Sequence, residues 1–275
     1  LTTALLLGSA MMVVPTTAYS NEIYLSQIGD DLDLDIVQDG ENNQVKPIST
    51  TSKLDGDDLT LSIDQNGDNH LLEGSVDGNR NTGDIYQGNG GNDNFARVDV
   101  TGDDNTLKVY QGKHADGSLD TDETGDHEAY WTVTGNNNDL GSYQTDVNRS
   151  GGGGSPHHLA NIIDGDRNKV EHIQMGKAGH DGFIEITGDD NTVDVYQRGN
   201  GGVKWADIVL TGDDHTVDVN QRGSNSASAA IDLTNSGGAY TLDLDQNVTT
   251  ASDSYSITGY CATPSGCSVI VNRNN

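Results

Sequence analysis

Aspartate pairs that directly follow a glycine recur along the chain, and they are the residues best suited to chemistry. The triplet Gly-Asp-Asp begins at Gly29, Gly56, Gly102, Gly188 and Gly212. Because Ca²⁺ prefers carboxylate oxygens as ligands, these pairs are candidate calcium sites. The loop patterns of EF-hands and calcium-binding β-rolls are absent, so a solvated acidic ridge is the alternative interpretation. The candidate calcium ligands are Asp103, Asp104, Asp189, Asp190, Asp213 and Asp214.

Motifs for catalysis are missing from the sequence. It contains no Gly-x-Ser-x-Gly elbow, no His-Glu-x-x-His helix and no phosphate-binding loop. Two carboxylates at a suitable separation could cleave a glycosidic bond, but aspartate is so abundant here that such a pair is uninformative. The pair His157-His158 follows a Gly- and Ser-rich stretch, which favours a flexible loop over a metal site. We therefore predict no catalytic residue, no enzymatic activity and no required cofactor, with Ca²⁺ left open.

The composition excludes several classes of partner and fold. The 275 residues include 43 acidic and 14 basic ones, for a formal net charge of −29. Such a charge repels phosphate backbones and anionic lipid headgroups, so nucleic acid is not an expected partner. Only 32% of the residues are hydrophobic, which argues against a large globular core. The apolar residues nevertheless fall in short alternating runs, which a disordered chain would not need.

The first twenty residues differ from the rest of the chain. They are apolar and uncharged, and Ala18 and Ser20 are the small residues expected at a signal-peptidase site. We expect residues 1–20 to be a signal peptide, with a mature chain that starts near Asn21. The protein is then secreted, to the extracellular space or cell surface, without a membrane span after signal removal. In an exported protein, Cys261 and Cys267 favour a short-loop disulfide over a metal pair.

The segments that carry the aspartate pairs repeat along the chain. Residues 187–199 read TGDDNTVDVYQRG, and residues 211–223 read TGDDHTVDVNQRG. A glutamine closes each repeat, and after the first interval successive glutamines are 22 to 33 residues apart. A period of this size is typical of solenoids and other repeat folds. The glutamine column comprises Gln27, Gln38, Gln65, Gln87, Gln111, Gln144, Gln174, Gln197, Gln221 and Gln246.

Alternation within the repeats predicts strands. In VDVYQ, the side chains of Val193, Val195 and Gln197 share one face of a strand, and the residues between them face the other way. The segment IEITG at 184–188 supplies a partner strand, so each repeat is strand, turn, strand, turn. One unit cannot bury its apolar face alone, whereas stacked units share a thin continuous core. We therefore predict an all-β fold, a β-solenoid of about ten coils with two short strands per coil, stacked in register.

Glutamines inside such a core need hydrogen-bond partners, because an unpaired buried amide costs about 1–3 kcal/mol. In a stack, each side-chain amide can bond to the amide of the next coil, as in the ladders of cross-β structures. We therefore interpret the glutamine column as a structural ladder and not as a set of active-site amides.

The chain resembles the curlins, the secreted subunits of bacterial curli fibres. Curlin repeats place Gln, Gly and Asn at fixed offsets around two strands per coil, as VDVYQRGN and NNQV do here. The resemblance covers residues 21–250, with loop insertions near 44–56 and 145–158, and leaves 251–275 as a C-terminal coil or cap. It implies curlin-like cross-β stacking and a structural subunit that self-assembles into extracellular amyloid fibres for biofilm matrix and adhesion. The implied partners are further copies of the chain, a second curlin-type nucleator and the secretion machinery.

Two other functions are left open by the sequence. One is a monomeric solenoid adhesin, or a sugar- or ice-binding protein, that works through a flat outer face. The other is a polysaccharide-degrading β-helix, although such enzymes generally have longer and more apolar coils. If fibres form, repulsion between stacked acidic turns predicts that salt favours assembly, as does a pH lowered toward the carboxylate pKa of about 4.

Overall fold

The computed structural model describes most of the chain after residue 20. The described ranges are 21–28, 32–47, 54–55, 58–66, 68–78, 80–88, 94–102, 104–111, 127–135, 137–144, 157–165, 167–176, 179–188, 190–198, 204–212, 214–223, 227–235, 239–248, 253–261 and 266–273. The expected signal peptide and most of both expected loop insertions lie outside these ranges. No helix occurs among the described residues, so none is long and apolar enough to cross a membrane.

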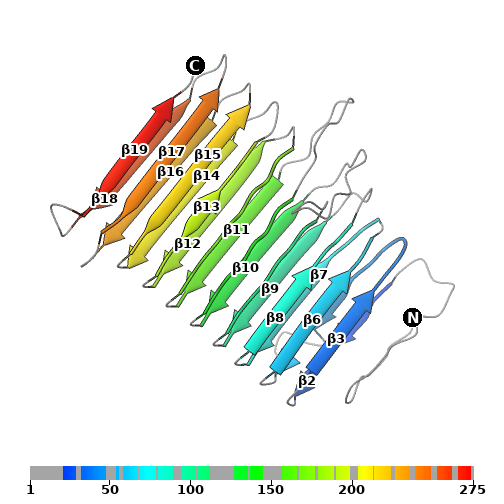
Figure 1. Ribbon diagram of the computed structural model, residues 1–275. Helices are drawn as coiled ribbons and strands as arrows, with labels where there is room; N and C mark the ends of the chain where they lie inside the picture. The colour runs from blue at the N-terminus through cyan, green and yellow to red at the C-terminus, as the bar shows by residue number, and fades with distance from the viewer. Residues whose placement is uncertain are drawn as a thin grey trace.

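The strands form two layers (Figure 1). The first layer is a 12-stranded sheet in the order β1-β4-β7-β9-β10-β11-β12-β14-β16-β18, with β2 and β5 beside this path. Its strands are β1 (Ile23–Leu25), β2 (Gln27–Ile28), β4 (Val45–Pro47), β5 (Leu54–Asp55), β7 (Leu72–Asp77), β9 (Phe95–Thr101), β10 (Glu128–Thr134), β11 (His157–Asp164), β12 (His180–Thr187), β14 (Lys204–Gly212), β16 (Ala227–Asn235) and β18 (Ser254–Tyr260).

The second layer consists of a three-stranded sheet, β3-β6-β8, and a four-stranded sheet, β13-β15-β17-β19. Its strands are β3 (Leu32–Val37), β6 (Asp58–Asp64), β8 (Arg80–Ile85), β13 (Val193–Val195), β15 (Thr216–Gly223), β17 (Thr241–Val248) and β19 (Ser268–Arg273). Every strand pair in both layers is parallel, and equivalent residues of neighbouring coils lie opposite one another. Ile184 of β12, for example, pairs with Ile208 of β14. The predicted β-solenoid, stacked in register, is therefore confirmed.

Fewer coils than the predicted ten have a strand in both layers. Strands occur in both layers in seven coils, because the second layer has three strands in one sheet and four in the other. Opposite β9, β10 and β11, the described residues of the second layer form no strand, although the backbones of adjacent coils still bond, as from Leu140 N to Lys169 O at 3.2 Å. Non-glycine residues with positive φ lie in these coils, among them Gln111, Gln144 and Gln174. Such angles are incompatible with a continuous strand, which explains the difference from about ten coils.

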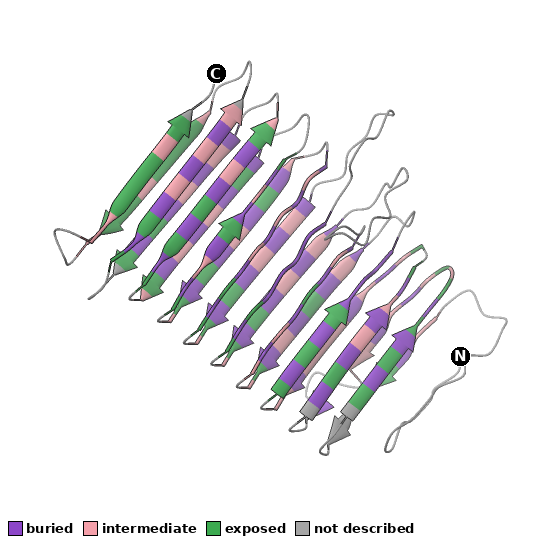
Figure 2. Ribbon diagram, viewed as in Figure 1, coloured by how far each residue is buried: buried purple, intermediate pink, exposed green. Residues whose placement is uncertain are grey.

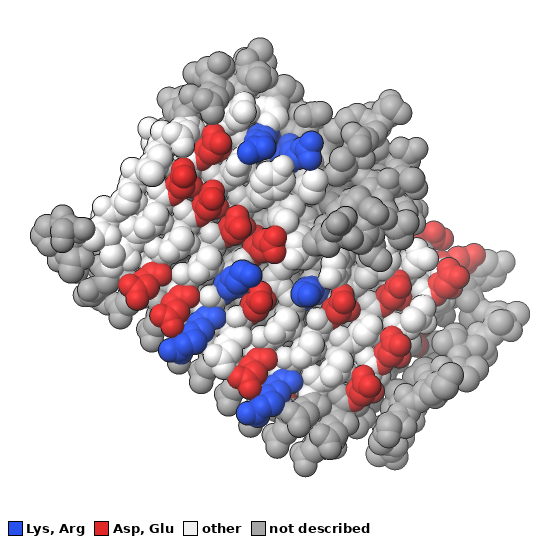
Figure 3. All heavy atoms as spheres, in the orientation of Figure 1, with Lys and Arg blue, Asp and Glu red and all other residues white. Residues whose placement is uncertain are grey.

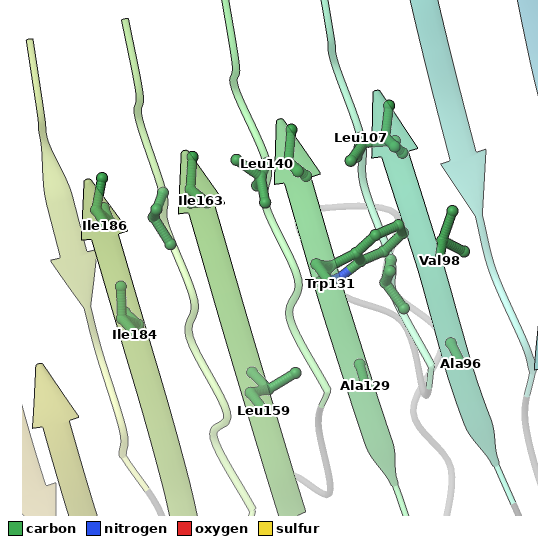
Figure 4. Close-up of a cluster of buried hydrophobic side chains, with 14 of the residues drawn as sticks. Ala96, Val98, Leu107, Ala129, Trp131, Leu140, Leu159, Ile163, Ile184 and Ile186 are labelled. Atoms are coloured by element: carbon green, nitrogen blue, oxygen red, sulfur yellow. The ribbon is translucent and has the colours of Figure 1, made fainter. Parts of the chain in front are cut away.

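The core is a thin layer of apolar side chains between the two sheets. Burial alternates along the strands, so that every second residue faces inward (Figure 2). Val193 and Val195 are both 1% exposed, as the two-residue period predicts. Side chains from β9, β10, β11 and β12 point toward the opposite layer, with Trp131 the largest of them (Figure 4). Burial of a Val, Leu or Ile side chain contributes about 1.5–3 kcal/mol, and one such side chain follows another from coil to coil.

Glycines hold the turn between the layers. At Gly102 the φ angle is 152°, and a Cβ would lie 1.5 Å from the carbonyl oxygen of Gly78 in the preceding coil. At Gly135, with φ at 156°, a Cβ would lie 1.5 Å from the carbonyl oxygen of Gly102. The turns therefore stack more closely than any residue with a side chain permits, which accounts for the repeated glycine of the sequence pattern.

Candidate functional site: polar columns in the core and acidic rows outside it

The glutamine column forms a buried hydrogen-bonded ladder. In the first part of the chain, Gln38 Nε2 donates to Gln65 Oε1 at 2.8 Å, and Gln65 Nε2 to Gln87 Oε1 at 2.6 Å. The same contact continues through Gln111, Gln144, Gln174 and Gln197 at distances of 2.8, 2.7, 3.3 and 2.8 Å. Most of these amides also donate to a backbone carbonyl at the start of the next first-layer strand, as Gln111 does to Glu128 O at 2.9 Å. The ladder thus joins each coil to the next and closes each turn.

Between Gln38 and Gln246, one pair of neighbouring glutamines in the ladder is not hydrogen-bonded. Gln246 Nε2 donates to Gln221 Oε1 at 3.0 Å, opposite in direction to the contacts before it. Gln197 Oε1 accepts from Gln174, and Gln221 Oε1 accepts from Gln246, so neither oxygen accepts from the other of these two residues. Gln197 and Gln221, which the sequence predicts to be ladder neighbours, are therefore not hydrogen-bonded to each other. Gln27, which the sequence predicts to belong to this column, lies in β2 of the first layer, where its register partner is Leu54 and not a glutamine; its side chain is outside the described residues.

A second ladder follows the turns between the layers. Asn105 Nδ2 donates to Asn81 Oδ1 at 2.6 Å, and Asn138 Nδ2 to Asn105 Oδ1 at 2.7 Å. The run continues through Asn168 and Asn191 and ends at a histidine, His215, whose Nδ1 is 2.6 Å from Asn191 Oδ1. Each asparagine from Asn81 to Asn168 also donates to the carbonyl of the glycine three residues before it. This ladder fixes the glycine turns in place.

A third polar column lies where the first-layer strands begin, and it is rich in histidine. Its residues occupy equivalent register positions and are at most 2% exposed. The rings of His127 and His157, and those of His157 and His180, have centroids 4.8 Å apart. Next in the column is the side chain of Lys204, whose Nζ has no hydrogen-bond partner among the described residues. The column comprises Asn43, His70, Asn94, His127, His157, His180 and Lys204.

Burial lowers the pKa of three histidines in this region, His70, His172 and His180. Desolvation, with a smaller contribution from the charge of His127, lowers the pKa of His70 to about 4. Desolvation likewise lowers the pKa of His172, which lies opposite the column in the second layer, to about 3. The pKa of His180 falls well below its ordinary value through desolvation and then through His157 and Lys204, and desolvation lowers that of Lys204. A proton added to His70, His172 or His180 therefore places a charge in the desolvated interior.

The sequence analysis did not predict this column: strand parity places each histidine on an inward face, but only the register of neighbouring coils aligns them. His180 is separated from Ile184 and Ile186 by an even number of residues along β12, so all three lie on its inward face. The expectation of a flexible loop at His157-His158 is wrong, since both residues belong to β11. His157 faces the core, and His158 faces outward, where its Nδ1 is 3.1 Å from Asp181 Oδ2.

The acidic turns do not stack as a uniform row of carboxylates. Position two after the turn glycine holds Arg80, Asp104, Asn137, Arg167, Asp190 and Asp214 in successive coils. Arg80 Nε lies 3.4 Å from Asp104 Oδ2, and Arg167 Nε lies 3.3 Å from Asp190 Oδ2. Asp103, Asp189 and Asp213 are outside the described residues. Within the described part of the chain, no group of three or more His, Cys, Asp or Glu side chains is placed to hold a metal ion.

Carboxylates do stack on the outer face of the second layer. Asp194, Asp218 and Asp243 lie opposite one another in β13, β15 and β17. Desolvation and then the neighbouring Asp194, Asp243 and Asp245 raise the pKa of Asp218, and desolvation followed by Glu171 raises that of Asp194. Figure 3 shows acidic side chains in a row across this face, with a few basic ones beside them. Among the described residues, these strands therefore bring carboxylates of adjacent coils into register without an arginine between them.

The two cysteines lie at the C-terminal end of the solenoid. Cys261 follows β18, Cys267 precedes β19, and a disulfide joins them across six residues. The disulfide therefore closes the turn of the last coil, and residues 254–273 extend both layers by one strand each.

Comparison with known protein families identifies one repeat. Residues 188–223, which contain β13, β14 and β15, match the curlin associated repeat. The matched segment runs from one turn glycine through Gln197 to Gln221, so it holds one full period of the glutamine ladder. The resemblance to the curlins is thus supported by an independent match to one repeat. No curated protein and no solved structure matches the chain.

Proposed function

Since residues 188–223 match a curlin associated repeat, we propose that the chain is a curli-type structural subunit. It is secreted and assembles with further copies into extracellular amyloid fibres that serve biofilm matrix and adhesion. A curlin-type nucleator and a secretion apparatus are the additional partners in this proposal. Among the described residues, the polar groups of the core form hydrogen-bonded ladders and not a cluster of catalytic groups, which favours a structural role over an enzymatic one.

The observation that supports assembly most is the unfinished state of the ladder and sheets at both ends. Gln38 Oε1 and Gln246 Oε1 are buried and accept no hydrogen bond from the described residues. The strands β1, β3, β18 and β19 end their sheets, so each has one backbone edge without a partner strand in the described chain. An unprotected parallel edge is a template for another strand. A second copy would continue the sheets of the first with the same spacing.

Electron microscopy of the purified mature chain tests this proposal. Incubation at room temperature and neutral pH should produce unbranched fibres, and the growth should accelerate when preformed fibres are added. A chain that stays monomeric at high concentration, with its β-structure intact, would contradict the proposal.

One feature favours a second candidate, a monomeric protein that binds through a flat outer face. Exposed threonines occupy equivalent positions at the ends of the first-layer strands and form a regular row of hydroxyl groups. Asp164 interrupts the row. The threonines are Thr101, Thr134, Thr187, Thr211 and Thr234. Binding of a soluble monomer to an insoluble polysaccharide or to ice, abolished by Thr187→Tyr and Thr211→Tyr, would support this candidate over the fibre subunit.

A further inference from the structure

Aromatic side chains gather on the outer face of the first layer, in the middle of the stack of coils (Figure 1). Phe95 of β9, Tyr130 of β10 and His158 of β11 follow one another, with ring centroids 5.7 and 5.3 Å apart. Phe183 of β12 and Trp205 of β14 occupy outward positions in the next two coils, and Trp205 is 41% exposed. These rings lie outside the core, so they can contact a ligand.

The spacing of the rings suits an extended polymer. Tyr130, Ala160 and Phe183 occupy one outward column in successive coils. Because coils repeat about every 4.8 Å, the rings of Tyr130 and Phe183 are attached about 10 Å apart, with only the methyl group of Ala160 between them. A glycan of β-1,4-linked sugars presents every second sugar at a comparable interval along its axis. Its flat, apolar ring faces can therefore stack on both aromatic side chains.

A hollow of about 300 Å³ lies beside Tyr130 on this face. It is at the lower end of the size range of small-ligand sites, so it suits one unit of a longer chain. The hydroxyl group of Thr132 and the guanidinium group of Arg97 can bond to the hydroxyl groups of a sugar there. The outward side chains that line the hollow are Phe95, Arg97, Tyr130, Thr132, Ala160 and Ile162.

The charge of this face favours a cationic ligand. The outward residues of β10, β11, β12 and β14 include carboxylates and neither lysine nor arginine. Desolvation and then the charge of Asp181 raise the pKa of Asp207, so these carboxylates repel one another. A protonated amine is attracted both to carboxylates and to the faces of aromatic rings. The carboxylates are Glu128, Asp164, Asp181, Glu185 and Asp207.

We propose that the outer face of β10, β11, β12 and β14 binds a cationic polymer of β-linked amino sugars. The sugar rings stack on Tyr130, Phe183 and Trp205, and the ammonium groups lie against the carboxylates among these rings. The face lies on the side of the solenoid and not at its ends, so it is present in the monomer and in a fibre alike. The inference therefore goes beyond the proposed fibre function and does not depend on it.

Other partners fit this face less well. A second copy would bring the same carboxylates into opposition, and nucleic acids or acidic glycans would be repelled. A peptide that adds a strand to a sheet needs a free edge, whereas β10, β11, β12 and β14 are paired on both sides. A basic peptide attracted by charge alone is the remaining competitor, and the experiment separates it from the glycan.

Titration of the purified mature chain with a short oligomer of glucosamine tests the proposal. The assay is run at pH 6.5 and followed by calorimetry and tryptophan fluorescence. Of the two tryptophans, Trp205 is exposed on this face and Trp131 is 2% exposed, so a change in emission reports on the face. We expect binding that weakens with salt, and much weaker binding of the uncharged, N-acetylated oligomer.

Two double variants of equal charge locate the site. Asp181→Asn with Asp207→Asn should weaken binding of the glucosamine oligomer by about fivefold or more, because two carboxylates beside the rings are lost. Asp194→Asn with Asp218→Asn removes the same charge from the outer face of the second layer. This control should bind with nearly wild-type affinity.

The aromatic contribution has a matched pair of its own, measured by calorimetry. Trp205→Ser should weaken binding by about fivefold, because a stacking surface is lost. Tyr260→Ser removes an aromatic side chain that is 67% exposed on the same layer, in β18, and should change little. Phe183→Ser replaces Trp205→Ser if the latter loses its β-sheet circular dichroism.

Several results would overturn the proposal. Equal weakening by the two aspartate pairs, or wild-type binding by Trp205→Ser and Phe183→Ser, would leave only general charge attraction. Polylysine that binds as tightly as the glucosamine oligomer, whatever the residue at 205, would assign the face to basic peptides. Equally tight binding of the N-acetylated oligomer would overturn the preference for a cation, and absence of binding would overturn the site itself. Each result holds whether or not the chain forms fibres.

Discussion

Acid should weaken this fold through its buried histidines. His70 lies in the third polar column between Asn43 and Asn94, and its Nδ1 is 3.0 Å from Asn94 Nδ2. Its pKa is lowered from 6.5 to about 4. Above pH 6.5 the side chain is neutral in both the folded and the unfolded chain and contributes no pH dependence. As the pH falls below 6.5, the unfolded chain binds a proton that the folded chain excludes, so stability is lost until the folded pKa is reached.

The magnitude follows from the pKa shift. At pH 4 the lowered pKa of His70 removes about 3 kcal/mol from the free energy of unfolding, and His172 removes a similar amount. Such losses are a large fraction of the stability of an ordinary domain. Protonation of Asp194 and Asp218, whose pKa values are raised mainly by desolvation, acts in the opposite direction. Acid is therefore expected to weaken the folded chain between pH 6.5 and 4, whereas the prediction that low pH favours assembly concerns the carboxylates and stays a prediction.

The assay is denaturant unfolding of the monomeric chain at pH 7 and pH 4, followed by circular dichroism. His70→Asn introduces the residue type that its column neighbours already have and should recover about 3 kcal/mol of the acid-induced loss. His158→Asn is the matched control, because His158 is outward and pairs with Asp181. It should leave the acid sensitivity unchanged. An equal loss of stability on acidification in wild type, His70→Asn and His158→Asn would refute the role of the buried column.

Three further predictions concern the ladders, the turns and the outer charge. Gln111→Leu removes the hydrogen bonds to Gln87 and Gln144 and should lower the free energy of unfolding by about 1–3 kcal/mol for each buried amide left without its partner. Tyr196→Ser on the outer face should cost less in the same denaturant titration. Equal costs would contradict the assignment of Gln111 to the inward face. Gly102→Ala should destabilise by about 3 kcal/mol or more, because its Cβ overlaps the preceding turn, whereas Gly74→Ala, with no atom within 4 Å, should be nearly neutral in thermal melts. If calcium binds specifically at the acidic turns, it should accelerate fibre growth at concentrations far below those at which sodium acts, and Asp→Asn changes at 189, 190, 213 and 214 should abolish that advantage. Identical growth rates with both ions at matched ionic strength would exclude specific calcium binding, so that the ions act only by screening the charge of a solvated acidic ridge.

Much of this fold could be predicted from the sequence because its interior obeys a simple period. The alternation in VDVYQ places Val193 and Gln197 on one face, and the structure buries both. The recurring turn glycine also has a local cause, since no side chain fits between stacked turns at Gly102. Signals of this kind need no knowledge of distant parts of the chain, so composition and spacing suffice to find them.

Other features depend on how neighbouring coils match, which spacing alone does not give. Asp104 and Asp190 belong to similar triplets, but each has an arginine from the preceding coil beside it, so the predicted row of carboxylates at the turns is broken. The loss of strand structure opposite β10 and β11 depends on positive φ angles at residues such as Gln144. The histidine column emerged only once the register had aligned His127, His157 and His180.

Fibre diffraction from the assembled mature chain tests the central claim most directly. If copies continue the parallel sheets of the solenoid, aligned fibres should give a meridional reflection at about 4.7–4.8 Å and an equatorial one at about 10 Å. Fibres that lack the reflection at about 4.7–4.8 Å, or a chain that forms no fibres at all, would contradict the claim that this solenoid is a self-stacking subunit.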